Sequence, residues 1–216
     1  MNRIGVALLA ATAAVLLSGA AQAKAPPGGV ELCGASACMH LDSATAEQFW
    51  TGTGSSSGFS RAMPGPFYLV RWHWQPQTEE SAYFIPGAAA VRWNDGDGHP
   101  GGWSALQPSA SAVLSRAAAG IEPYAAPTLT RVTVGGRIVR DPQSYFQLLA
   151  GKATWTFFTG RWLTVRFESA APSPWTDGTS IVRLSRTRPY VEIDGWFFRI
   201  SKATAARARH GLSLRG

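Results

Sequence analysis

Runs in which every second residue is large and apolar recur along the chain, and short stretches of helical composition separate them. The apolar positions are Tyr68, Val70, Trp72 and Trp74 in one such run and Leu163, Val165 and Phe167 in another. A period of two places alternate side chains on one face of a β-strand, so these residues are expected to face a core. The pattern therefore predicts a β-rich chain.

The order of the predicted elements occurs twice. Residues 30–42 and 132–141 each predict a strand, a tight turn, a second strand and an Asp. Each Asp precedes a short helical stretch, 43–50 in the first copy and 142–150 in the second. Asp is a favoured N-cap residue, and Pro142 suits the first helical position.

The correspondence continues through the rest of both copies. Arg71 and Arg166 occupy equivalent positions in the two alternating runs. Further strands are predicted at 81–85 and 91–94 in the first copy and at 180–184 and 191–194 in the second, and Asp194-Gly195 is a strong hairpin signal. Each copy ends in an Ala-rich helical segment, 109–119 and 202–210.

These features predict an α+β, β-rich fold built from a duplicated hairpin–helix–strands–helix unit in two packed halves. The predicted divisions are a first repeat over 30–120, a linker over 121–130, a second repeat over 131–211 and a tail over 212–216. Each half is small for independent stability, so we expect the halves to pack on each other.

The N-terminus has the layout of a secretory signal peptide. Arg3 gives a positive start, residues 4–17 are apolar, and Ala21-Gln22-Ala23 is a small-x-small cleavage pattern. We expect cleavage near Ala23, a linker over 24–29 and a secreted or extracytoplasmic location. The alternative is an uncleaved anchor helix, for which the apolar run is short. No transmembrane span is predicted in the mature chain, and export argues against a nucleic-acid partner.

Cys33 and Cys38 are the two cysteines of the chain, and four small residues separate them. In an exported protein this spacing predicts a disulfide that closes a hairpin turn. A catalytic redox pair is the alternative, but such pairs usually have two intervening residues at the start of a helix.

Several short motifs, together with the signal peptide, carry a family resemblance. They are Cys33-Gly-Ala-Ser-Ala-Cys38, Phe67-Tyr-Leu-Val-Arg71, Val134-Gly-Gly-Arg-Ile-Val-Arg-Asp-Pro142 and Asp194-Gly-Trp-Phe-Phe-Arg-Ile200. The chain resembles an uncharacterised group of secreted actinobacterial proteins. That resemblance implies no activity and assigns no functional residues.

One segment offers candidate metal ligands. The turn 94–102 is expanded relative to Asp194-Gly195, and Asp95, Asp97 and His99 alternate there with glycines. This arrangement is similar to a calcium loop, although the later Glu of such loops is missing. A solvated Gly-rich turn is the alternative. His40 and His73 are further candidates that could meet His99 at a transition metal.

Basic and aromatic residues offer candidate binding groups. Trp162 and Arg166 share one strand face, and with Arg71 they predict an anion or glycan groove, unless the arginines pair with Glu168 or Glu192. The formal net charge is +7, and residues 199–216 contain five basic residues and no acidic one. Lys202, Arg207 and Arg209 could therefore contact an anionic polymer or lipid, or they could simply favour the helix dipole.

The sequence favours a non-enzymatic, exported binding or scaffold protein of the cell envelope. Its expected partner is a cell-wall polymer, a glycan or another envelope protein. The alternative is an extracytoplasmic metal-assisted hydrolase that uses the 94–102 loop. The chain contains no nucleophile elbow, phosphate-binding loop or dinucleotide fingerprint that would favour an enzyme of those classes.

Overall fold

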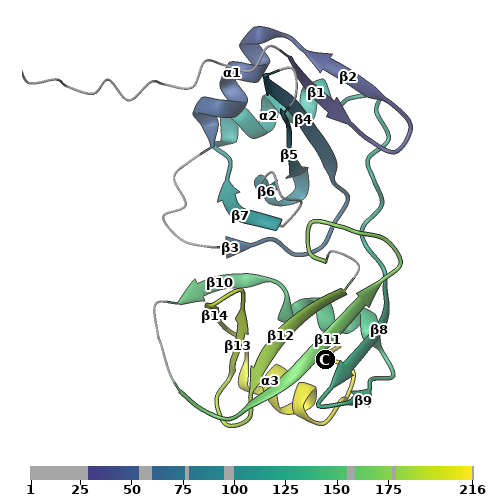
Figure 1. The fold of residues 1–216 in the computed structure, drawn as a ribbon, viewed down its shortest axis with the longest axis vertical. Coiled ribbons are helices and arrows are strands. Elements are labelled where there is room, and N and C mark those ends of the chain that lie inside the picture. The colour runs from purple at the N-terminus through teal and green to yellow at the C-terminus, as the bar shows by residue number, and fades with distance from the viewer. Residues whose placement is uncertain are drawn as a thin grey trace, which may run out of the picture.

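The computed structural model describes residues 29–53, 60–75, 78–94, 100–154, 159–176 and 179–215. They form two antiparallel β-sheets, each with helices on one face, and the two sheet layers lie one above the other (Figure 1). The predicted signal peptide (1–23) and the predicted calcium ligands Asp95, Asp97 and His99 lie outside the described residues.

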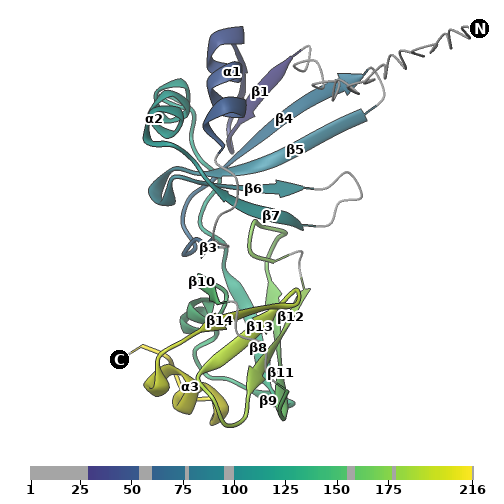
Figure 2. The ribbon, with the colours of Figure 1, turned by 90° about the vertical axis from the view of Figure 1, so that its left-hand side faces the viewer.

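The first sheet has six strands in the order β2-β1-β4-β5-β6-β7. Helices α1 (Ser43–Gly52) and α2 (Pro108–Ala117) lie on one side of it (Figure 2). Leu32, Val70 and Phe84 are fully buried beneath them. The strands are β1 (Val30–Cys33), β2 (Cys38–Leu41), β4 (Tyr68–Gln75), β5 (Thr78–Ile85), β6 (Ala90–Asn94) and β7 (Pro100–Ala105), and the 3-10 turn η1 (Pro86–Ala88) joins β5 to β6.

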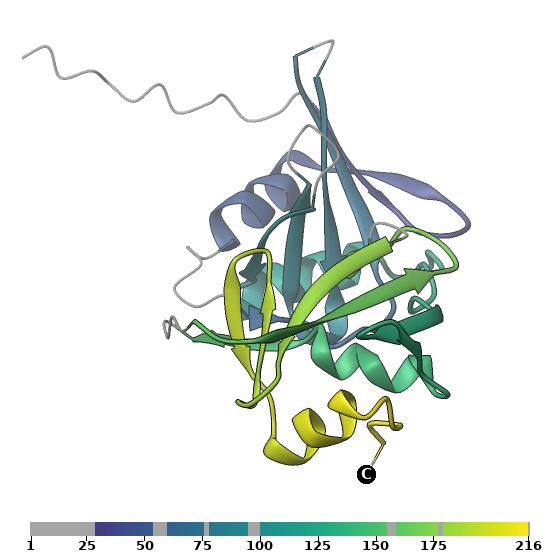
Figure 3. The same cartoon turned by 60° about the horizontal axis from the view of Figure 1, so that its bottom comes forward.

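The second sheet has eight strands in the order β3-β10-β14-β13-β12-β11-β8-β9. The 3-10 segment η2 (Pro142–Leu148) and helix α3 (Lys202–Arg209) lie on the same side of this sheet (Figure 3). The strands are β3 (Ser60–Arg61), β8 (Leu129–Val134), β9 (Arg137–Ile138), β10 (Gly151–Thr154), β11 (Trp162–Ser169), β12 (Thr179–Ser185), β13 (Tyr190–Ile193) and β14 (Trp196–Arg199).

The predicted duplication is confirmed by strand order and register. The order β2-β1-β4-β5-β6-β7 in the first sheet corresponds to β9-β8-β11-β12-β13-β14 in the second. Arg71 lies between Glu31 and Ser81 on the neighbouring strands, and Arg166 lies between Thr133 and Ile181 in the same way. The chain therefore has an α+β, β-rich fold made of two packed copies of one unit.

Both predicted Asp caps are present, but the helices that follow them differ. The Asp42 carboxylate accepts a hydrogen bond from Thr45 N at 2.7 Å, which lowers the pKa of Asp42. Asp141 accepts a bond from Ser144 N at 3.4 Å, and the predicted helical stretch after it is a 3-10 helix, whereas the one after Asp42 is an α-helix. Tertiary contacts hold this segment in the tighter turn, because Gln143 bonds to the backbone of Pro127 and Leu129.

The two halves share a hydrophobic interface centred on Trp175. This residue follows β11 in a loop that reaches toward the first sheet (Figure 1). Its ring lies 6.3 Å from that of Phe67 and 5.8 Å from that of Trp103, and its Nε1 donates to Ala62 O at 2.7 Å. Trp175 is buried, so it joins the first half of the chain to the core of the second.

The predicted disulfide is present between Cys33 and Cys38. The turn that it closes contacts the segment between the halves, where Ala35 N donates to Glu122 O at 2.8 Å. Gly34 is required there because a Cβ at this position would lie 2.1 Å from Glu122 O. The hairpin therefore does not depend on the disulfide alone for its position.

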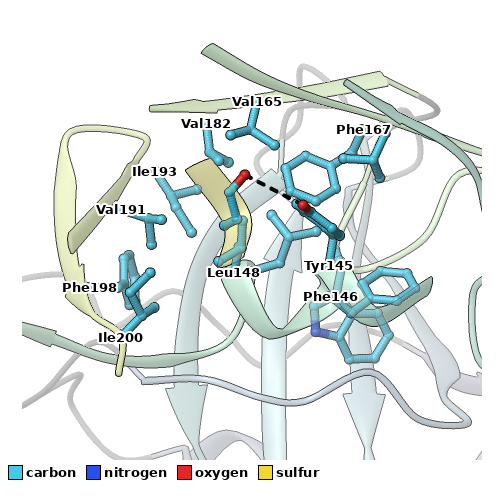
Figure 4. Close-up of a cluster of buried hydrophobic side chains, with 14 of the residues drawn as sticks. Tyr145, Phe146, Leu148, Val165, Phe167, Val182, Val191, Ile193, Phe198 and Ile200 are labelled. Carbon is cyan, nitrogen blue, oxygen red and sulfur yellow. Dashed lines mark hydrogen bonds between the residues drawn. The ribbon is translucent and has the colours of Figure 1, made fainter. Parts of the chain in front are cut away.

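The C-terminal segment is bound to η2. Tyr145 lies among buried apolar side chains (Figure 4). Its hydroxyl donates to Leu212 O at 3.0 Å and also lies 3.5 Å from Ala208 O. The Asp141 carboxylate accepts a bond from Ser213 Oγ at 2.7 Å, and this bond lowers the pKa of Asp141. These bonds make the C-terminal residues part of the second half.

We predict that Tyr145 makes the stability of the protein sensitive to alkaline pH. Burial raises the pKa of Tyr145 to about 12 from its usual value of 10.0. The raised pKa belongs to the folded state, so burial of the neutral Tyr145 hydroxyl contributes to the free energy of unfolding. This contribution is complete below pH 10 and is lost as the pH rises through about 12. In urea unfolding, the free energy of unfolding of the wild-type protein is expected to fall between pH 8 and pH 11. The fall is expected to be smaller in Tyr145→Phe, which has no hydroxyl to ionise.

The same variant tests the hydrogen bond at neutral pH. Tyr145→Phe is expected to lower the free energy of unfolding by about 1 kcal/mol at pH 7, because Leu212 O loses its partner. An equal alkaline decline in the wild-type protein and the variant would contradict the role given to Tyr145.

No helix in the described part of the chain combines the length and the apolar character needed to cross a membrane.

Candidate binding surface

The second sheet has one face that no described helix covers. Along β11 the side chains of Val165 and Phe167 point into the core, so those of Trp162, Thr164 and Arg166 point to the other side. We call this side the open face of the second sheet. Its members include Arg131, Thr133, Ile138, Lys152, Trp162, Arg166, Ile181, Arg183, Glu192, Phe197 and Arg199.

Two aromatic rings and an arginine form the centre of the open face. The rings of Trp162 and Phe197 are 5.9 Å apart and inclined by 36°, and both side chains are partly exposed. The guanidinium of Arg183 lies 5.8 Å from the Trp162 ring, a cation–π distance. Arg183 also donates to the carboxylate of the buried Glu192, which raises the pKa of Arg183.

The acidic residues of the open face are already paired. The Glu192 carboxylate accepts hydrogen bonds from Arg183 Nε and from Gly195 N. Glu168 Oε1 forms an ion pair with Arg131 Nη1 at 3.8 Å. Among the residues that the structure describes, no side chain forms a hydrogen bond or ion pair with Arg166. The predicted pairing of Arg166 with Glu168 or Glu192 is therefore absent. Among the described residues, the open face therefore keeps a net positive charge.

Exposed apolar side chains flank Arg166. Ile138, Thr133, Arg166 and Ile181 lie in one row across four strands. Ile138 is 64% exposed and Ile181 is 52% exposed, whereas the core side of the same strands is buried. The row offers apolar contact on both sides of one cation, a combination that suits a ligand with both carbon surface and negative charge.

The equivalent face of the first sheet is different because the second half covers part of it. Trp103 and Ile85 are buried in the shared core, although they point away from α1 and α2. The predicted groove residue Arg71 lies on the remaining part, beside Glu31, and is partly buried. Arg71 and Arg166 thus occupy equivalent positions in two sheets and do not line one groove.

The predicted basic residues of the C-terminal helix lie on the other side of the second sheet. Arg207 Nε donates to Ser213 O at 2.6 Å, and Arg209 donates to Ser185 O at 2.9 Å and Arg188 O at 2.5 Å. Burial lowers the pKa of Arg209. Lys202 is exposed. Arg207 and Arg209 therefore fasten the C-terminal segment, and their predicted binding role stays a prediction.

The predicted histidine site is not assembled from the described residues. His40 and His73 are exposed on β2 and β4, but neither belongs to a group of three side chains that could hold one metal ion. Within the described ranges, the group of three side chains close enough to hold one metal ion is Glu31, Cys33 and Cys38. The sulfurs of the two cysteines are joined in the disulfide. The prediction that Asp95, Asp97 and His99 bind calcium concerns residues outside those ranges.

A surface hollow of about 320 Å³ lies between β2 and helices α1 and α2. Its lining includes Met39, His40 and Val113, together with the charged pair of residues Asp42 and Arg116. The Asp42 carboxylate caps α1 and already accepts a hydrogen bond from Thr45 N. The opposite charges of the hollow favour no particular ligand, in contrast to the open face.

The sequence identified Trp162 and Arg166 but missed Arg183, Phe197 and Ile181. The hairpin at Asp194-Gly195 fixes the register of β13 and β14, which pairs Glu192 with Phe197. In the first half, Trp103 pairs with Arg92, and in the second half Phe197 pairs with Glu192. Phe197, and not Trp196, is therefore the residue equivalent to Trp103. Register was the signal that could have placed Phe197 on the open face.

Comparison with family models, curated proteins and solved structures found no match to this chain.

Proposed function

We propose that this protein is an exported, non-enzymatic binding module of the cell envelope and that the open face of its second sheet binds a polyanionic glycan. The observation that carries the proposal is that the partly exposed Trp162–Phe197 pair and the exposed Arg166 lie on one face of the second sheet. Flat aromatic surfaces contact sugar rings, and guanidinium groups bind carboxylate, sulfate or phosphate groups. One extended sugar polymer could satisfy both.

The charge of the open face supports an anionic ligand. Lys152, Arg166 and Arg199 are exposed there and have no acidic partner among the described residues, while Glu168 and Glu192 are paired with arginines. A neutral glycan would use the rings but not this excess charge. The proposal therefore predicts binding that weakens as the salt concentration rises.

Export rests on the predicted signal peptide and is supported by the disulfide. Disulfide bonds persist in oxidising compartments and are rare in the cytosol. The Cys33–Cys38 bond is consistent with an extracytoplasmic location, where envelope glycans are accessible.

The binding prediction is tested with dextran sulfate and uncharged dextran, which share one sugar backbone. The chain from residue 24 onward is expected to bind dextran sulfate in isothermal titration calorimetry and to bind dextran at least tenfold more weakly. Trp162→Ala is expected to weaken binding about tenfold, which corresponds to about 1.4 kcal/mol. Arg166→Ala is expected to weaken it about threefold to tenfold, because one exposed cation is lost.

Lys202→Ala provides the matched control. It removes one exposed positive charge from α3, on the other side of the sheet, so it is expected to change affinity less than twofold. Equal losses in Arg166→Ala and Lys202→Ala would indicate attraction by net charge alone and would contradict the proposed surface. Thermal unfolding of each variant verifies that the fold is retained.

A further inference from the structure

The β1–β2 hairpin of the first sheet carries a cluster of side chains that could bind a metal ion, separate from the open face of the second sheet. Cys33 pairs with Cys38 across the hairpin, and Glu31 is two residues before Cys33 on the same strand face. The two sulfurs and a carboxylate oxygen of Glu31 all lie within 4.8 Å of one another. Two thiolates and a carboxylate are ligands that zinc accepts.

We propose that the reduced β1–β2 hairpin binds Zn²⁺ through Cys33, Cys38 and Glu31, and that formation of the disulfide closes this site. The protein would then carry a metal site that is open only under reducing conditions. The proposal concerns a different part of the molecule from the glycan surface, so neither depends on the other.

The fold holds the two cysteines together without the disulfide. Their Cα atoms are 4.0 Å apart because they are direct partners in the ladder of β1 and β2. Strand β1 also pairs with β4 over its whole length, Gly34 N donates to Ala37 O at 2.8 Å, and the turn is bonded to Glu122 O. Reduction therefore removes one covalent bond and leaves the contacts that position the ligands.

The separation of the cysteines suits tetrahedral zinc. With Zn–S bonds of about 2.3 Å, two thiolates on one ion lie about 3.8 Å apart. Sulfurs on directly opposed strand residues reach that distance by side-chain rotation alone. Glu31 supplies the third ligand, and the fourth position is left for water.

The surroundings allow access and balance charge. Cys33 is buried, whereas Cys38 and Glu31 are exposed, so one side of the cluster is open to a reductant and to a metal ion. Two thiolates and one carboxylate give Zn²⁺ a net charge of −1 at the site. Arg71 lies directly beside Glu31 on β4 and supplies a positive charge on the same sheet face.

A dithiol reductant supplies the two electrons that open the zinc site. Thiol–disulfide exchange breaks the Cys33–Cys38 bond, forms one disulfide in the reductant and leaves two protein thiols, so two electrons and two protons enter the protein. Zinc binding then releases both thiol protons, because the thiolate is the ligand. Reoxidation by exchange with a disulfide-containing oxidant forms the protein disulfide, reduces the oxidant to two thiols and expels the ion.

The test compares the oxidised and reduced forms of the same chain. The chain from residue 24 onward is reduced with a phosphine, desalted without oxygen and titrated with Zn²⁺ against a chromophoric chelator. One Zn²⁺ per chain is expected for the reduced protein and none for the oxidised protein. Cobalt in place of zinc is expected to give the thiolate charge-transfer absorption of a tetrahedral site.

Matched variants separate the ligands from nonspecific binding. Glu31→Gln is expected to weaken zinc binding at least tenfold, whereas Glu47→Gln, which removes an exposed carboxylate from α1, is expected to leave it unchanged. Zinc binding of equal strength by the oxidised and reduced chains would overturn the proposal. So would equal affinities of the wild-type and Glu31→Gln chains, with far-UV circular dichroism confirming that each stays folded.

Discussion

Replacing Trp175 by Ala is expected to lower the free energy of unfolding by about 3–5 kcal/mol, the range for removing a large buried aromatic side chain. Trp175 is 1% exposed and contacts Phe67 and Trp103 of the first half. The substitution leaves a cavity at the interface and deprives Ala62 O of the indole donor. Urea unfolding followed by far-UV circular dichroism measures the loss.

The same experiment reports whether the halves unfold together. Because Trp175 belongs to the second half and its ring partners Phe67 and Trp103 to the first, its removal is expected to separate one transition into two. Trp175→Phe keeps a ring but not the Nε1 donor, so it is expected to cost less than Trp175→Ala. A loss below about 1 kcal/mol in Trp175→Ala would contradict the central role of this residue.

Replacing Gly52 by Ala is expected to lower the free energy of unfolding by about 1–3 kcal/mol, the usual cost of overpacking a core. Gly52 is the last residue of α1, and a Cβ added there would lie 2.2 Å from the Cβ of Ala110 in α2. Gln107 N also donates to Gly52 O at 2.9 Å, which holds the two helices in close contact. The helices would have to separate to accept the methyl group.

Two variants make the explanation specific to this contact. Gly65→Ala adds the same methyl group where nothing lies within 4 Å, so its stability is expected to be unchanged or slightly higher. Ala110→Gly in the Gly52→Ala background removes the opposing Cβ and is expected to restore part of the loss. Absence of any restoration would indicate that the cost of Gly52→Ala arises elsewhere.

The candidate surface was partly predictable because strand alternation is local. Trp162 and Arg166 are four residues apart, so their common face follows from the period of two alone. Arg183 and Phe197 join them through the pairing of β11 with β12 and of β13 with β14, which depends on register between separate segments. Residues that meet across strands leave no pattern within one segment.

The C-terminal arginines illustrate the opposite case. Their sequence pattern, a basic helix end without acids, indicated exposed charges. Arg209 instead reaches Ser185 O, 24 positions earlier in the chain, and Arg207 bonds to the backbone beyond the helix. Carbonyl groups belong to every residue, so composition carries no signal for such partners.

The sequence by itself determined the repeated unit, the Asp caps at Asp42 and Asp141, the disulfide hairpin and the face of β11 on which Arg166 lies. Each depends on residues close together in the chain, where periodicity, capping and turn chemistry act. Only the tertiary structure decided the 3-10 form of η2, the pairing of β3 with β10 in the second sheet and the position of Trp175, whose indole bonds to a carbonyl 113 residues away. Trp175 takes this position because the two halves bury a common apolar surface, and that surface exists only once both halves have folded.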